Sequence, residues 1–155
     1  MNEAFATLLT ARLTELTKDL LFEYKPTGVK RAPQIVETML APKAHDYQEG
    51  QEMPLVRWAI YEGGFDRFHS SPFSIILHAG IYTSGDITAG TRDITELALA
   101  LGLIVNNRSF PPYRLETPVP FTIGSPEPGS EGLHPHPYYW LTMKLQFTVP
   151  SGHGG

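Results

Sequence analysis

The sequence predicts one α+β domain in which helices pack on a mostly antiparallel four-stranded sheet, in the order α-β-β-α-β-β. Two observations lead to this fold class. Two segments repeat apolar residues at helical spacing, and four segments have the composition or alternation of strands. Two helices are too few to connect a doubly wound parallel sheet. The length of 155 residues suits a single domain over residues 1–150, and we expect residues 151–155 to form a flexible tail.

The first helix is predicted over residues 3–24, because apolar side chains recur there every three or four positions. Asn2 is the candidate N-cap, and Pro26 with Gly28 should end the helix. Its predicted apolar stripe consists of Phe5, Leu8, Leu9, Leu13, Leu16, Leu20 and Leu21.

The second helix is predicted over residues 91–107, with Thr91 as its N-cap and residues 83–90 as the loop before it. Its stripe consists of Ile94, Leu97, Ala98, Leu101, Ile104 and Val105.

The first two strands are predicted over residues 54–61 and 72–82. Before them, residues 33–41 begin with a proline, which is compatible with either a short helix or an extended arm. On the second strand, alternate residues should face the core: Phe73, Ile75, Leu77, Ala79 and Ile81.

The last two strands are predicted over residues 113–123 and 138–149. Pro118 and Pro120 remove two backbone donors from the earlier one, which should therefore lie at an edge or be broken. The later one alternates without interruption, and one face carries Tyr139, Leu141, Met143, Leu145, Phe147 and Val149.

The composition excludes several classes of function. The chain has no cysteine, which rules out disulfides, thiolate catalysis and cysteine-ligated metal sites. Its 12 basic and 16 acidic residues give a net charge of -4, so the basic excess of a general nucleic-acid binder is missing. No apolar run approaches the roughly 20 residues that span a bilayer, and the amphipathic start is typical of mature structure and not of a signal peptide.

Catalytic patterns are weak in this sequence, and we expect no catalytic residue, metal or cofactor. His134 and His136 stand in a proline-rich segment that favours solvated histidines over a metal pair. His78 falls on an apolar strand, where a satisfied core or interface histidine is the simpler interpretation. A small metal-dependent hydrolase that uses these three histidines remains a remote alternative.

Long loops and aromatic residues indicate an interaction protein. Three connections, at about 42–53, 62–72 and 124–137, are long for a small domain, and such loops usually have a function. Interfaces favour aromatic anchors. The second connection has two of them, Phe65 and Phe68, with Asp66 and Arg67 between them. The interface candidates are Phe65, Asp66, Arg67, Phe68, Tyr138 and Trp140.

One face of the predicted sheet is also a candidate interface. On the second strand, the residues that point away from the core include Ile76 and His78, and the last strand adds Trp140. This face is too apolar to be only a solvated surface, so we expect a partner subunit to cover it.

In its order of motifs, the chain resembles the tail terminator or tail-completion proteins of tailed bacteriophages. The resemblance covers about residues 30–150 and includes no catalytic signature. The segments that carry it are APQIVETMLAPK at 32–43, MPLVRWAIYEGG at 53–64, FSIILHAGIYTSGD at 73–86, TRDITELALALGLIVNN at 91–107, YRLETPVPFTIG at 113–124 and HPYYWLTMKLQFTVP at 136–150. The loop at 124–137 is longer than this pattern leads one to expect.

The resemblance implies an α+β fold, a hexameric ring and no enzymatic activity. The ring would cap the tail tube, stop its polymerisation and present a surface to the head–tail connector proteins. It would be assembled in the host cytoplasm and reside in the virion, at the head-proximal end of the tail. Its partners would be copies of itself, the tail tube protein and the connector protein, with no sequence-specific nucleic acid and no membrane. A neck or head–tail connector protein is the alternative structural function.

Overall fold

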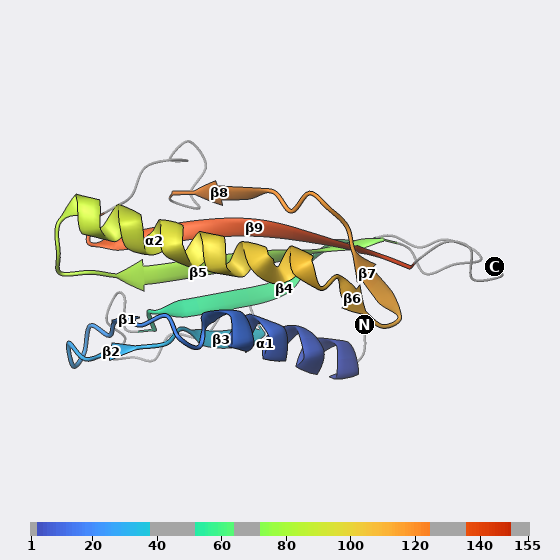
Figure 1. The fold of residues 1–155 in the computed structure, drawn as a ribbon, viewed down its shortest axis with the longest axis horizontal. Helices are drawn as coiled ribbons and strands as arrows, with labels where there is room; N and C mark the ends of the chain where they lie inside the picture. The colour runs from blue at the N-terminus through green and yellow to red at the C-terminus, as the bar shows by residue number, and fades with distance from the viewer. Residues whose placement is uncertain (1–2, 38–51, 64–71, 125–135, 150–155) are drawn as a thin grey trace.

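The computed structural model describes residues 3–37, 52–63, 72–124 and 136–149. Figure 1 shows two helices lying over an elongated sheet. The helical elements are α1 (Glu3–Thr17), α2 (Ile87–Gly102) and the 3₁₀ turn η1 (Leu103–Asn106). The strands are β1 (Phe22–Glu23), β2 (Lys30–Arg31), β3 (Gln34–Glu37), β4 (Leu55–Gly63), β5 (Phe73–Tyr82), β6 (Ser109–Phe110), β7 (Tyr113–Leu115), β8 (Phe121–Ile123) and β9 (Tyr138–Thr148).

The main sheet has seven strands, in the order β3-β4-β5-β9-β7-β6, with β8 also pairing with β9. The β3–β4 pair is parallel, whereas the other pairs are antiparallel, and β1 and β2 form a separate hairpin. The chain is α+β, but the predicted mostly antiparallel four-stranded sheet is wrong. The prediction did not include β1, β2 or β6, did not add β3 to the sheet, and counted β7 and β8 as one strand, because segments of two to four residues carry no readable alternation.

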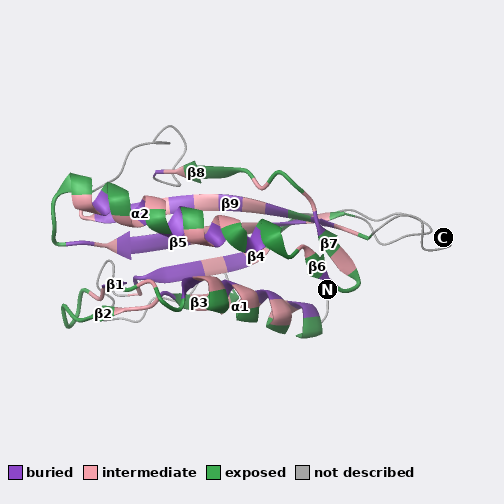
Figure 2. Cartoon of the chain, in the orientation of Figure 1, coloured by how far each residue is buried: buried purple, intermediate pink, exposed green. Residues whose placement is uncertain are grey.

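Both helices cover the same face of this sheet. The core residues of α1 and α2 belong to one cluster with the inward residues of β4, β5 and β9 (Figure 2). Most of the predicted inward residues of the two central strands are confirmed, and Ile75, Leu77, Leu145 and Phe147 are fully buried. At the strand ends the prediction is weaker, since Phe73 is half-buried and Val149 is exposed. Gly90 of α2 lies directly on the Tyr139 ring, and a Cβ there would be 2.2 Å from the ring Cζ. The glycine therefore lets the helix approach the sheet closely.

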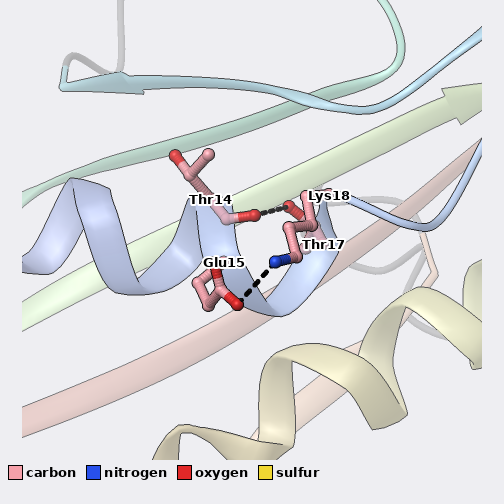
Figure 3. A network of polar contacts seen from close by, with 4 residues as sticks. All are labelled: Thr14, Glu15, Thr17 and Lys18. Carbon is pink, nitrogen blue, oxygen red and sulfur yellow. Dashed lines mark hydrogen bonds and ion pairs between the residues drawn. The ribbon is translucent and has the colours of Figure 1, made fainter.

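The first helix is shorter than predicted, because it ends at Thr17 and not near residue 24. Thr17 is buried, and its hydroxyl donates to the Leu13 carbonyl at 2.9 Å. A weaker contact of 3.5 Å reaches the Thr14 carbonyl (Figure 3). Beside it, Lys18 and Glu15 form an exposed ion pair of 2.8 Å. The chain then turns, and Phe22 packs into the core as part of the β1–β2 hairpin. Pairing with β2 thus replaces the last two turns of the predicted helix.

The second helix begins earlier than predicted, at Ile87. Asp86, and not Thr91, is the N-cap, because its Oδ1 accepts the Ala89 N–H at 2.8 Å. Residues 87–90 are therefore helical and not loop. Gly90 misled the prediction, since a glycine usually disfavours a helix interior, whereas here close packing requires it.

The interruption predicted for residues 113–123 is confirmed. The segment supplies two short strands, β7 and β8, that pair separately with β9. Pro118 and Pro120 stand between them. Of residues 33–41, the structure describes 33–37, where β3 is extended, so the arm and not the helix is correct there.

We expect Leu101→Ala to lower the free energy of unfolding by about 2–5 kcal/mol, because Leu101 is fully buried and its truncation leaves a cavity. The matched control is Leu99→Ala on the same helix, where the side chain is 67% exposed and the change should stay below about 0.5 kcal/mol. Urea denaturation of both variants measures the difference. Equal effects would show that α2 does not pack as described.

Candidate functional site

The candidate site is the sheet face that points away from both helices, here called the helix-free face. It is built from alternate residues of β4, β5 and β9, which the strand pairing aligns in rows. His78 lies between Arg57 and Thr142, and Ile76 lies between Ala59 and Lys144. None of the described helices packs on this face. The pairing confirms that Ser74, Ile76, His78, Tyr82 and Trp140 share one face.

Trp140 is a half-buried anchor on this face. Its ring lies over Gly80 of the neighbouring strand, where an added Cβ would come within 2.7 Å of the ring. The Met53 methyl carbon would lie 2.9 Å from the same Cβ, so both side chains fill the space above Gly80. A large aromatic ring is thus packed against the sheet while part of its surface remains open, which is typical of interface anchors.

Tyr138, another predicted interface residue, is engaged mainly within the chain. It is 8% exposed, and its hydroxyl accepts a hydrogen bond from Lys25 Nζ at 2.7 Å. The same ammonium lies 5.4 Å from the ring centre of Tyr82. These contacts attach the β1–β2 hairpin to the end of the sheet, so Tyr138 has a structural role.

Beside His78, the described charges of the helix-free face are paired. Arg57 forms an ion pair with Glu52 at 3.4 Å, and both side chains are about 20% exposed, at 20% and 21%. Burial, and secondarily the nearby Arg57 charge, lowers the pKa of His78 below its ordinary value of 6.5, so this histidine is neutral at pH 7. A partner that covered this part of the face would therefore bury a paired charge and a neutral ring.

The other half of the face combines apolar area with one cation. Ile76 and Ala59 are half-buried. Lys144 lies with its Nζ 5.8 Å from the ring centre of Tyr61, which is 61% exposed at the end of β4. Neither contact could be predicted from the sequence. The Lys144–Tyr61 contact depends on the register across three strands, and the Arg57–Glu52 pair depends on how the chain enters β4.

Four of the predicted interface residues lie outside the described residues, namely Phe65, Asp66, Arg67 and Phe68. His134, one of the three histidines of the hydrolase alternative, also lies outside them.

The described histidines do not form a joint site. His136 is exposed, and its Nδ1 lies 2.6 Å from the Tyr139 hydroxyl. His78 pairs across the sheet with Thr142, and the strand from Tyr138 to Thr142 alone covers about 13 Å. Zinc ligands lie about 2 Å from the metal, so one ion cannot bind both rings. Across the described ranges, no three histidine, aspartate or glutamate side chains are grouped closely enough to hold a metal.

Comparison with known proteins adds no relative. No family model matches this sequence, and no curated protein matches it significantly. None of the helices in the described part of the chain is long and apolar enough to cross a membrane.

We expect acid to destabilise the fold partly through His78. Its lowered pKa means that the unfolded chain binds this proton more readily, so stability is lost as the pH falls below about 6.5 towards the folded-state pKa. His78→Asn should remove that contribution. The free energy of unfolding, measured in urea at about pH 7.5 and about pH 5, should therefore fall less in the variant than in the wild type. An equal fall in both proteins would contradict the assignment.

Proposed function

We propose that this chain is a tail terminator of a tailed bacteriophage. It forms a ring that caps the tail tube, stops tube polymerisation and joins the tube to the head–tail connector. The proposal involves no catalytic step. It rests on the ordered motifs that resemble this family and, in the structure, on one observation: a nearly neutral sheet face that carries a half-buried tryptophan and no described helix.

The helix-free face is large enough to form the centre of an interface. Its three strands, β4, β5 and β9, are together about 15 Å wide, and the 11 residues of β9 extend over about 35 Å. The product is about 500 Å², roughly two-thirds of the ~800 Å² that each partner buries in a stable complex, so residues around the face would complete the contact. A second copy of this chain is the partner that a ring requires.

A ring requires a particular kind of contact. Each subunit must present two different surfaces, one to each neighbour, and the rotation between subunits must close. In this proposal the helix-free face is one of the two surfaces, and it contacts a different surface of the next copy. A face that paired with itself would stop at a dimer.

Capping the tube also follows from physical requirements. The ring must match the tube end on one side without presenting the same end on the other. Several equivalent weak contacts around the ring provide avidity, so no single contact to the tube has to be strong. The net charge of -4 keeps free subunits apart before assembly.

We expect Ile76→Lys to prevent ring formation, because it places an unpaired charge in the centre of the helix-free face. The matched control is Leu99→Lys, which adds the same charge to an exposed position of α2 on the helical side. Mass photometry should find the Ile76 variant monomeric and the control oligomeric, and circular dichroism should find both folded. If only the control loses the ring, the helical side carries the contact and the proposed surface is wrong.

Phage that lack this protein should produce filled heads separate from tails, and many of the tails should be overlong, because the growing end of the tube stays open. Electron microscopy of lysates measures tail length directly, and supplying the gene in trans should restore uniform tails. Tails of normal length that fail to join heads would instead support the neck or connector function. A complete absence of tails would contradict both functions.

A further inference from the structure

A polar hollow, here called the arginine hollow, opens where η1 meets the β6–β7 hairpin. Its volume is about 320 Å³. It is lined mostly by side chains that can donate hydrogen bonds, and no carboxylate is among them. The lining includes Asn106, Asn107, Arg108, Ser109, Tyr113 and Arg114. Because Ser109 pairs with Arg114 across the hairpin, these two side chains share the face that points away from the buried Phe110.

The two arginines are weakly engaged compared with others in the chain. Among the described residues, Arg114 has neither an ion pair nor a side-chain hydrogen bond, and Arg108 has only a long contact of 3.4 Å from Nη1 to the Thr117 hydroxyl. By contrast, Arg57 is paired with Glu52. Glu116, directly after β7, carries the carboxylate that is nearest in sequence. It accepts a hydrogen bond from the Thr148 hydroxyl and forms no ion pair with Arg114 among the described residues.

The end of η1 does not account for these charges. Carbonyl groups at a helix C-terminus favour a nearby cation. Arg12 already provides it, because its Nη1 donates to the Asn107 carbonyl at 2.9 Å while its guanidinium lies 4.1 Å from the ring centre of Phe110. Arg108 and Arg114 therefore add positive charge beyond what the helix end requires.

We propose that the arginine hollow binds a phosphate group. A guanidinium presents parallel N–H donors that match two phosphate oxygens, and two guanidiniums balance a phosphate charge of one to two. Asparagine amides and the Ser109 hydroxyl supply further donors for the remaining oxygens. The volume exceeds the roughly 30 Å³ of a water molecule severalfold, which leaves room for the anion. The site does not depend on ring formation.

The test uses the full chain and inorganic phosphate as the probe, titrated at low salt and followed by backbone NMR shifts. Residues 106–114 should respond saturably. Arg108→Gln and Arg114→Gln should each weaken binding about tenfold or more, since each removes charge-assisted hydrogen bonds. Arg92→Gln is the matched control, because Arg92 is exposed on α2 and does not line the hollow. Circular dichroism verifies that all variants are folded.

A second arm identifies the source of the phosphate. If a short DNA duplex displaces inorganic phosphate from the same residues, and does so less at higher salt, the ligand is a nucleic-acid backbone. If the duplex does not compete, the ligand is a free phosphate or a small phosphate ester. Either result supports the hollow. The proposal is overturned if phosphate causes no saturable shift at residues 106–114, or if Arg92→Gln weakens binding as much as the hollow variants do. The oligomeric mass of the same samples is measured in parallel, so that a failure to bind phosphate can be distinguished from a failure to form the ring.

Discussion

The pairing of β5 with β9 determines most of this structure. The two strands align over ten residue pairs, from Phe73 opposite Phe147 to Tyr82 opposite Tyr138. Because their apolar residues alternate in phase, the core side chains of the two strands reach one face, and both helices lie there and cover them. A shift of register by one residue would exchange the two faces. The same pairing therefore creates both the core and the helix-free face.

The elements that the sequence predicted well are the long periodic ones. The buried sides of β9 and of the helical segment from Ile94 to Ile104 could be predicted without knowing which elements pack against them, because the length and period of the apolar pattern were sufficient. Short elements were missed because their stability comes from contacts distant in sequence. β3 is an example, since its four residues exist as a strand only through parallel pairing with β4. The early end of α1 has the same origin, because the hairpin overrides local helical propensity there.

The candidate site could be predicted only in part, for a related reason. Alternation along β5 and the position of Trp140 were sufficient to predict an apolar second face. The charges on that face could not be predicted, because the neighbours of His78 follow from how three strands align. Tyr138 shows the same limit. Its aromatic character predicts an interface anchor, whereas its contact with Lys25, more than a hundred positions away, is visible only in the fold.

The two proposed sites differ in chemistry in a way that suits different kinds of partner. The helix-free face is nearly neutral and partly apolar, so contacts there gain mainly from burial and depend little on salt. The arginine hollow is polar and charged, so binding there is exchangeable and salt-dependent. A ring would repeat the hollow in every subunit at fixed spacing. A phosphate site too weak to matter in a monomer would then act on a polyphosphate through several simultaneous contacts, provided that the spacing fits. Assembly through the helix-free face would thus increase the affinity of the arginine hollows for a polyphosphate without any change in the structure of each hollow.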